Sequence, residues 1–543
     1  LFGRFERFLE MASREAELRD GEKSLPVRRI ERQRVIEGVV GGESLARCPG
    51  DRGRLHQARA QIALKPFATK AEGGAGAVQR IESAAIGATQ RHAHGIDLRQ
   101  PLADRHAKAA LRDFAVAQLD ANNGIRGKGD NGDVVTFVDH EAERRIIEAG
   151  NERAFFVARL RAERATAKPV LVMGHMDVVG ADTAKWETPP FVATIKDGYL
   201  YGRGTIDDKG MLAATVAAMQ QLATRRDRLT RDIIFLGTAA EEGGPSVGVD
   251  VVLAQHWDLI KDAEFALNEG GRIRVANGMV RTVNIQTTEK IYYTVEAVAT
   301  GPSGHGSVPL PDNALAALAR AVARVHAAKP PVRLNETTRL YFTRLAEIEP
   351  DALMKGAMLA IGDPAASPEQ VNRAAAVLSR DPLYNATLRA GQSLTLLNGG
   401  IRSNVIPSEG KATFNVRIVP GDDIHAVVAA MQEAGGEPSV RFALSGEARL
   451  APPVSPVSTA LFQSMEAAAR AMEPRTVVVP FMSTGATDGA ALRAKGIPTY
   501  GILPLPLPME DELRMHGDNE RVPLPALGWA TEYLYRVIVG VAR

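Results

Sequence analysis

Residues 201–211, YGRGTIDDKGM, are the stretch on which the interpretation of this chain depends. The preceding KDGYL predicts a short strand and a turn, and the following MLAATVAAMQQLA has apolar residues at helical spacing. Three glycines allow the backbone to bend tightly where the helix begins. Asp207 and Asp208 therefore lie at a strand-to-helix corner, where an aspartate either caps the helix or belongs to a site. The motifs around this corner favour a metal site.

The composition is that of an ordinary globular protein, with 45% hydrophobic and 24% charged residues. A length of 543 residues predicts about three domains. The formal net charge of +2 argues against a dedicated nucleic-acid surface, and no apolar run approaches the roughly 18–20 residues that cross a bilayer. The single cysteine excludes an intramolecular disulfide and a cysteine-based zinc site, so a metal must be bound by histidine and carboxylate.

Residues 1–150 form an atypical leader that is rich in Arg, Gly and Ala and shows no sustained period. Three interpretations remain open: a disordered basic leader, an extra domain, or sequence that was never selected to fold. The abrupt change of texture near residue 151 favours the last. Towards the end of the leader, VVTFVDHEAERRIIEA predicts a strand and a short helix. No apolar core of signal-peptide type is found in residues 1–18, and the compartment, cytoplasmic or exported, stays open.

Beyond the leader, AFFVARL predicts a strand, and three further segments predict buried strands that end in acids or histidine. They are KPVLVMGHMDVV, RDIIFLGTAAEEGG and DAEFALNEGG, and helical patterns alternate with them. Alternating strands and helices predict a doubly wound α/β sheet, whose sites lie at the carboxyl ends of its strands. We expect residues 151–286 to be the first part of this domain and residues 449–543 the second.

Between these parts, residues 287–448 predict a smaller inserted α+β domain. KIYYTVEAVATG alternates apolar and polar residues like a half-exposed strand, and NALAALARAVARVHAA is an amphipathic helix. GKATFNVRIVPG and PSVRFALSG predict two more strands, with HAVVAAMQEAG as a helix between them. A helical elaboration is expected from about residue 330 to residue 395.

Histidines beside glycines and acids at strand ends form one set of candidate ligands. A zinc site without cysteine takes imidazole nitrogen and carboxylate oxygen, and two metals about 3.5–4 Å apart need a shared ligand and further ligands of their own. The sequence supplies enough ligands for two metals, namely His175, Asp207, Glu242, Glu269 and His516. Glu241 and Asp177 are then left for proton transfer and for support of a ligand.

Seven motifs in order resemble the motif series of the dinuclear-zinc exopeptidase family: GHMDVV, GRGTIDDKG, AAEEGG, LNEGG, SGHGSVP, GATDG and MHGDNERV. This family includes glutamate carboxypeptidase, succinyl-diaminopimelate desuccinylase, aminoacylase and carnosinase-like dipeptidases. The resemblance is strongest to the carboxypeptidase S and Gly-Xaa carboxypeptidase branch. The segments that carry it are WETPPF, DGYLYGRGTIDDKG, LNEGGRI and a following EK. The resemblance covers about residue 151 to the C-terminus and does not extend into the leader.

The resemblance implies two divalent metal ions, with Zn2+ as the expected metal, although cobalt or manganese suits the same ligands. It implies that His175 and Glu269 bind one ion, that Glu242 and His516 bind the other, and that Asp207 bridges them. Asp207 is chosen over Asp208 because the family pattern of Asp, any residue, Lys matches Asp207–Lys209.

The resemblance also implies the catalytic groups. Glu241 would be the general base, which takes a proton from the attacking water and passes it to the leaving amine. Asp177 would hydrogen-bond and orient the imidazole of His175. The resemblance also implies a substrate-binding role for six residues: His305, Asn404, Arg417, Gly485, Thr487 and Asp488. His305 resembles a histidine that reaches across a dimer to the oxyanion, and Arg417 and Asn404 resemble groups that hold the substrate carboxylate. Arg402 is either structural or substrate-facing.

Two classes of function follow. The first is a metal-dependent hydrolase that cleaves an amide or peptide bond next to a free carboxylate, acting on a small peptide or an N-acyl-amino acid. The second is a catalytically silent binding protein on the same fold. Every expected ligand and the expected base are present, which favours the enzyme. A homodimer formed through the inserted domain is expected from His305.

Overall fold

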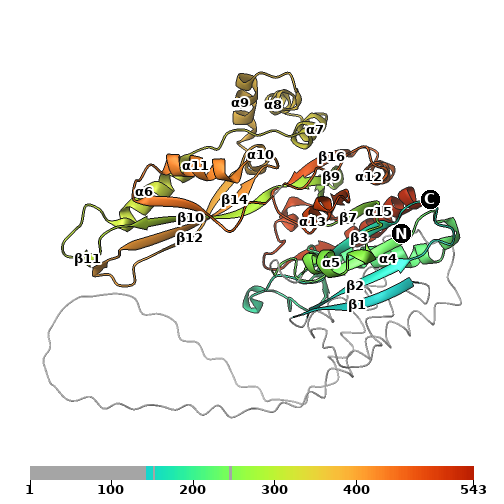
Figure 1. Ribbon diagram of the computed structural model, residues 1–543. Coiled ribbons are helices and arrows are strands. Elements are labelled where there is room, and N and C mark those ends of the chain that lie inside the picture. Colours follow the sequence, from blue (N-terminus) through green and yellow to red (C-terminus); the bar gives the residue numbers. More distant parts are fainter. Residues whose placement is uncertain (1–141, 151–152, 244–247, 450) are drawn as a thin grey trace, which may run out of the picture. The chain divides into compact units, whose positions relative to one another are not determined.

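The computed structural model describes residues 142–150, 153–243, 248–449 and 451–543 (Figure 1). The predicted leader lies outside the described residues except for residues 142–150. These form strand β1 (Ala142–Gly150), which pairs antiparallel with β2 (Arg153–Leu160). The short helix expected here is wrong. Ile147 and Ala149 pack against the core at a spacing of two, and the exposed Ile146 and Glu148 alternate with them as in a half-buried strand.

A ten-stranded mixed sheet is the centre of the catalytic unit, which confirms the predicted α/β class. Its middle strands β6, β3, β7 and β17 run parallel, and β1 and β2 extend one edge antiparallel. β16 pairs parallel with β9 beside the main path. The remaining bounds are β3 (Val170–His175), β6 (Ile233–Thr238), β7 (Phe265–Asn268), β8 (Arg272–Ala276), β9 (Met279–Glu289), β16 (Val477–Ser483), β17 (Thr499–Gly501) and β18 (Pro506–Leu507).

Helices cover both faces of this sheet, as in a doubly wound fold. Leu171 and Met173 of β3 pack in one cluster with α5 (Val249–Gln255) and α13 (Gly489–Ala494). Gly174, the next residue of β3, faces Leu212 of α4 (Lys209–Ala223) on the opposite side. α15 (Leu524–Ala542) packs on α4 and on α12 (Ala460–Met472). The short helices are η2 (Thr183–Lys185), η3 (Arg226–Arg228), η4 (Trp257–Leu259) and α14 (Met509–Glu512).

Helix α4 is buried on more sides than its single predicted apolar face. Of the five apolar residues at helical spacing, Met211, Leu212, Met219 and Leu222 are buried and Val216 is half-buried, and the alanines between them are buried as well. The reason is that α4 lies between the sheet and α15, and small alanine side chains allow the close packing that this position requires.

A separate three-stranded sheet joins distant parts of the chain. Its order is β19 (Arg521–Pro523), β5 (Tyr199–Tyr201) and β4 (Thr194–Lys196), and both pairings are antiparallel. The pairing of β19 with β5 brings the loop that follows β5 beside the loop that precedes β19. These two loops carry the motifs with Asp207 and His516.

The inserted domain has a four-stranded antiparallel sheet in the order β12 (Gly391–Gly399), β14 (Glu409–Ile418), β10 (Ile291–Thr300) and β15 (Val440–Ser445). Helices α6 (Ala314–Ala327) and α11 (Ile424–Gly435) pack on it (Figure 1) and bury a core that includes Val295, Leu318 and Phe414. The predicted strands and helices of this domain are confirmed. A small ribbon pairs β11 (Gly304–His305) with β13 (Val405–Ile406).

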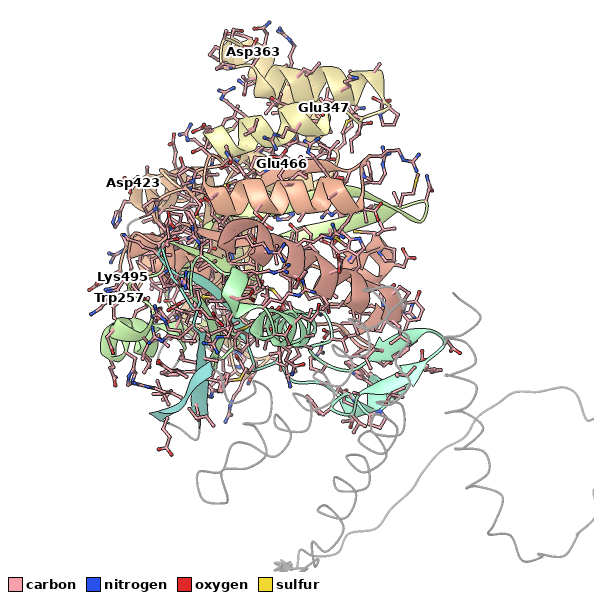
Figure 2. All side chains as sticks on the ribbon, turned by 90° about the vertical axis from the view of Figure 1, so that its right-hand side faces the viewer. Trp257, Glu347, Asp363, Asp423, Glu466 and Lys495 are labelled. Carbon is pink, nitrogen blue, oxygen red and sulfur yellow. The ribbon has the colours of Figure 1, made fainter. Side chains whose placement is uncertain are left out.

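The predicted helical elaboration is confirmed as four helices, which pack on the catalytic sheet. Tyr341 and Phe342 share a core cluster with Val477, Val479 and Phe481 of β16. In Figure 2, Glu347 and Asp363 mark the segments that follow α7 and α8. The bounds are α7 (Glu336–Leu345), α8 (Ala352–Gly362), α9 (Pro368–Leu378) and α10 (Pro382–Leu388). Across the part of the chain that the structure describes, every helix is too short or too polar to cross a membrane.

Candidate metal centre

Three neighbouring strands deliver polar side chains to one edge of the catalytic sheet. His175 is the last residue of β3, Glu241 and Glu242 follow β6, and Glu269 comes directly after β7. β3 lies between β6 and β7 with parallel pairing on both sides. The three strand ends therefore meet, as expected for a site at the carboxyl edge of an open α/β sheet.

Asp207 stands at the centre of the cluster because each of its oxygens faces a different imidazole. Asp207 Oδ1 lies 2.9 Å from Nε2 of His175, and Oδ2 lies 3.1 Å from Nε2 of His516. His516 Nε2 is also 2.7 Å from Glu242 Oε1. Ligand atoms of His175, Asp207 and Glu242 lie within 4.8 Å of one another, a spacing that suits a bound metal ion.

Asp177 orders this edge of the sheet through both its backbone and its side chain. Its backbone oxygen lies 3.0 Å from Nδ1 of His175, which fixes the ring with Nε2 turned to the cluster. Its carboxylate is 3.7 Å from the same nitrogen. Instead, the carboxylate accepts the backbone N–H groups of Glu241 and Glu242, at 3.1 and 3.0 Å. Asp177 therefore orients the imidazole of His175 through its backbone oxygen, and it orients Glu241 and Glu242 through its carboxylate.

Buried negative charge dominates the electrostatics of the cluster. Burial raises the pKa of Glu241 to about 8, and burial together with the neighbouring Asp207 raises the pKa of Glu269 well above its usual range. Burial also acts on Asp207, but hydrogen bonds from His175 and His516 hold the pKa of this carboxyl below its usual range. Acids packed this closely repel one another unless cations compensate them. Imidazole nitrogens and carboxylates around such a charge fit one or two divalent cations.

A buried ion pair that sequence reasoning did not single out holds the two central loops together. Arg203 donates to Glu520 Oε2 at 2.6 Å and to the backbone oxygen of His516 at 3.2 Å. Glu520 Oε1 accepts the backbone N–H of Ile206 at 2.8 Å and that of Asp207 at 3.3 Å. We call this ion pair the Arg203–Glu520 clamp. The sequence contained a signal for it, because the two residues belong to the motifs GRGTIDDKG and MHGDNERV.

Asp208 does not cap the helix with its side chain. It occupies the N-cap position of α4 but makes no capping hydrogen bond. Its carboxylate is fully buried against Gly174, where only the missing Cβ leaves room for it. Burial raises the pKa of Asp208 well above its usual range.

The loop that follows β16 brings the GATDG motif to the same edge. Thr238, the last residue of β6, donates to Asp488 Oδ2 at 2.9 Å. Burial raises the pKa of Asp488 to about 6. Gly485 N–H donates to Ser483 Oγ at 3.1 Å, and the Thr487 hydroxyl is hydrogen-bonded to Glu289. The structure therefore brings Asp488 to the end of β6, the strand that precedes Glu241.

The other expected substrate-binding residues lie in the inserted domain. His305 and Asn404 are neighbours on the β11–β13 ribbon, where Gly306 N–H donates to the backbone oxygen of Asn404. In the described residues, no hydrogen bond or ion pair joins either of them to the cluster. Arg417 lies on β14, with its guanidinium 4.8 Å from the ring centre of Tyr292 and its Nε donating to Asn415.

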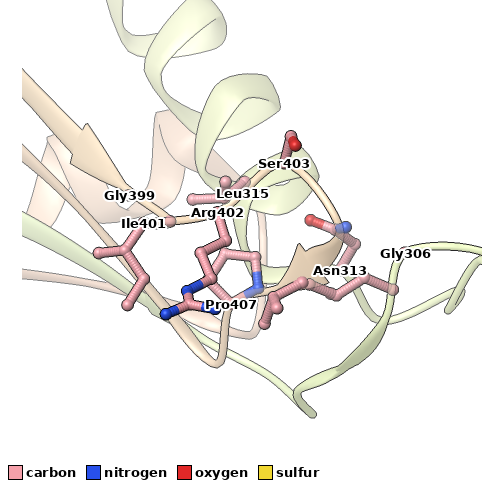
Figure 3. A pocket seen from close by; sticks show the side chains of 11 residues that line it. Gly306, Asn313, Leu315, Gly399, Ile401, Arg402, Ser403 and Pro407 are labelled. Atoms are coloured by element: carbon pink, nitrogen blue, oxygen red, sulfur yellow. The ribbon is translucent and has the colours of Figure 1, made fainter. Parts of the chain in front are cut away.

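A pocket of about 520 Å³ adjoins the ribbon (Figure 3). Arg402, which sequence reasoning left open, lines this pocket, and Figure 3 shows its side chain near those of Ile401 and Pro407. The remaining lining residues include Asn313, Leu315 and Ser403. Its mixed apolar and polar lining is common in sites for small molecules.

Histidines and carboxylates that can bind a metal, with a glutamate such as the half-buried Glu241 beside them, are typical of metal-dependent hydrolases. Comparison with known sequences identifies the class: the profile of peptidase family M20/M25/M40 matches residues 171–539, and the chain belongs to this family of metallopeptidases and amidohydrolases. The family is metal-dependent, with His175, Asp207 and Glu242 as the candidate site in this chain.

Two curated relatives match over about two thirds of the chain. The probable carboxypeptidase S-like 2 of Dictyostelium discoideum is 29% identical, over 68% of this chain and 71% of the relative. The human N-fatty-acyl-amino acid synthase/hydrolase PM20D1 is 28% identical, over 68% of this chain and 74% of the relative. Among solved structures, human carnosine dipeptidase 1 has the same fold with a TM-score of 0.55 at 16% identity, covering 81% of this chain and 97% of its own.

A metallo-carboxypeptidase of the same family from Sulfolobus solfataricus is similar to the same extent. Its TM-score is 0.54 at 18% identity, and the match covers 81% of this chain and 97% of the other. The expected resemblance to metal-dependent exopeptidases is confirmed by these comparisons.

Replacing Glu520 by Gln is predicted to weaken Zn2+ binding by about 10- to 100-fold, the range found when a group that orients ligands is lost. The neutral amide removes the negative charge that faces the Arg203 guanidinium and loosens the loops that carry Asp207 and His516. Competition with a chromophoric chelator measures the affinity. Glu437→Gln, which removes a carboxylate paired with Arg320 in the inserted domain, serves as the control. Equal affinities in both variants would show that the clamp does not position ligands.

Zinc affinity is predicted to rise with pH between about 6.5 and 10. Hydrogen bonds to Asp207 and Glu242 raise the pKa of His516 from 6.5 to about 10 in the metal-free protein, so a proton must leave before Nε2 binds an ion. The effect on folding has the opposite sign: protonated His516 stabilises the metal-free protein fully below pH 6.5, and this stabilisation is lost as the pH rises through 10.

Calorimetric titration with Zn2+ in two buffers of different ionisation enthalpy counts the released protons. His305→Asn is the control, because within the described part of the chain His305 hydrogen-bonds to Ser307 and not to the cluster, so its replacement leaves the proton count unchanged. An affinity that is flat over this pH range contradicts the assignment of His516.

Proposed function

We propose that this protein hydrolyses an amide or peptide bond adjacent to a free carboxylate, with Glu241 as general base. The observation that carries the proposal is the arrangement around Asp177, whose carboxylate holds the backbone of Glu241 and Glu242 together. Glu242 contacts Nε2 of His516, so Glu241 stays available for proton transfer.

Two divalent ions, expected to be Zn2+, are part of the proposal. Asp207 faces both histidines, so it is suited to a shared ligand, with His175 and Glu269 on one side and Glu242 and His516 on the other. When bound, such ions polarise the scissile carbonyl and lower the pKa of the attacking water. Positive charge of this kind also favours the ionised form of Glu241, which burial alone disfavours.

The proton path depends on residues of this chain. Glu241 takes a proton from the attacking water and returns it to the amine that leaves, which needs a carboxylate whose pKa lies near the working pH. In the metal-free protein its pKa is about 8, so small changes in local charge move it across neutral pH. Asp488 sits beside it and adds negative charge that supports this high value.

The substrate class follows from what the relatives' names have in common. A carboxypeptidase substrate and an N-acyl-amino acid both carry a free carboxylate next to the bond that is cut. The guanidinium of Arg417 suits such a carboxylate, and Asn404 adds an amide donor. A silent binding protein is disfavoured because no expected ligand has been replaced.

Replacing Glu241 by Gln is predicted to lower kcat by about 10²- to 10⁴-fold, because the amide cannot accept the proton. The zinc content is predicted to stay unchanged. Hydrolysis of Gly-Xaa dipeptides and N-acyl-amino acids is measured with Zn2+ and with a chelator, which abolishes turnover reversibly. Glu433→Gln, an exposed glutamate on α11, is the control. Zinc-loaded wild-type protein that turns over no substrate of either class would favour the binding protein.

We also propose a homodimer through the inserted domain, in which His305 serves the site of the other subunit. Edge strand β12 exposes Leu396 and Leu397 by 57% and 59%, and an open strand edge with apolar side chains favours pairing with another chain. His305 is exposed, which leaves it available to a second copy.

Subunit mixing tests this arrangement. His305→Ala and Glu241→Gln proteins are each predicted to be inactive, whereas a refolded mixture regains activity because one site of the mixed dimer has both residues. Leu397→Lys is predicted to give a monomer in sedimentation, and Leu353→Lys, an equally exposed position on α8, to leave the dimer intact. A fully active wild-type monomer contradicts the proposal.

A further inference from the structure

The residue pair Glu289–Lys290 belongs to the motifs of this chain but has no part in the function proposed above. Glu289 is the last residue of β9, and Lys290 links β9 of the catalytic sheet to β10 of the inserted domain. Both side chains are almost completely buried, at 3% and 2% exposure. Charged side chains are rarely buried to this extent unless their surroundings hold them in place.

The Glu289 carboxylate accepts hydrogen bonds from four donors. Oε1 accepts the backbone N–H of Thr487 at 2.9 Å. Oε2 accepts from the Thr487 hydroxyl at 2.8 Å, from Gln286 Nε2 at 2.7 Å and from Arg493 at 2.8 Å. Four hydrogen bonds are about as many as an ionised carboxylate accepts, and three of them converge on Oε2.

Thr487 is equally committed to this network. Its hydroxyl donates to Glu289 and lies 3.3 Å from Gln286 Nε2 and 3.2 Å from the N–H of Gly489, from which it accepts. One hydroxyl has one hydrogen and two lone pairs, so nothing remains for a substrate. Thr487 was expected to bind substrate, but its geometry is that of a residue that fixes the loop.

The network ends at the candidate centre on two sides. Asp488, next to Thr487, reaches Thr238 at the end of β6 and lies near Glu241. Gln286 packs against Gly270, directly after the expected ligand Glu269. Gly270 has a φ of +135°, and a Cβ at this position would collide with Gln286.

Glu289 is also anchored from the side of the inserted domain. Ser483 lies opposite Glu289 in the β16–β9 register, and Lys290 N–H donates to the Ser483 oxygen at 2.9 Å. The Lys290 ammonium donates to the backbone oxygen of Arg389 at 2.6 Å, in the two-residue link between α10 and β12. The segment that carries Glu289 is thereby bound both to β16 of the catalytic sheet and to the chain beside β12 of the inserted domain.

We infer that Glu289 is a positioning residue, which holds the Thr487–Asp488 turn against the end of β6 and links the attachment of the inserted domain to the surroundings of Glu241. This inference rests on the proposed function. Glu289 touches no reacting atom and acts through Asp488 and the loop that carries it. Misplacement of such a group by about 1 Å can lower a rate by roughly 10²-fold.

The test uses the full chain with Glu289→Gln. The amide either turns its NH2 towards three donors or gives up the bond from the Thr487 N–H, so the loop is released in both orientations. Hydrogen exchange followed by mass spectrometry is expected to show faster exchange over residues 484–489 and no change over residues 170–175. With N-acyl-amino acids, kcat is expected to fall by about 10- to 100-fold, with a smaller change in KM and an unchanged zinc content.

Asp232→Asn is the matched control. Asp232 is a buried carboxylate that precedes β6, at the other end of the strand, and it binds Arg159 and Arg161. This variant is expected to lower stability and to keep kcat. Unchanged exchange over residues 484–489 in Glu289→Gln, or an equal loss of kcat in Asp232→Asn, would overturn the inference.

A second pair of variants decides the question if Glu289→Gln does not fold. Thr487→Val removes only the hydroxyl and is expected to lower kcat, whereas Thr487→Ser keeps the hydroxyl and is expected to restore it. Equal activity in the two variants contradicts the inference. If the wild-type protein hydrolyses no substrate, the proposed function fails, but hydrogen exchange still shows whether Glu289 holds the loop.

Discussion

The catalytic unit is built around one carboxylate that faces two imidazoles. Asp207 has to remain ionised while it is buried among other acids, and the two histidines make this favourable by donating to its two oxygens. The surrounding structure serves this arrangement. Asp177 fixes one ring, the Arg203–Glu520 pair fixes the backbone on both sides of the carboxylate, and neighbouring parallel strands supply the remaining acids.

The sequence predicted well those features that depend on local pattern. Buried strands that end in His175, in Glu241 and Glu242, or in Glu269 were visible as apolar runs that stop at polar residues, and the structure brings their ends together. The helix of the inserted domain at residues 314–327 was visible from its spacing, with Asn313 as its cap. The metal assignments themselves remain proposals.

Features set by distant contacts were harder to predict. The segment VVTFVDHEAERRIIEA suggested a strand and a short helix, but pairing with β2 makes residues 142–150 a strand. Asp177 was expected to hydrogen-bond and orient His175, and only the folded turn after β6 shows that its carboxylate also holds the backbone N–H groups of Glu241 and Glu242. Glu289 and Arg493 are 204 residues apart, and no spacing in the sequence indicates that they meet.

The pairing of β5 with β19 has a consequence for how the protein is made. Arg521 and Tyr201 meet across 320 residues, so at about 10 residues per second a ribosome needs roughly half a minute between them. During that interval the nascent chain has its acids but neither His516 nor the Glu520 clamp. Chains that end before residue 516 therefore lack both His516 and Glu520, which contact Asp207 in the complete fold.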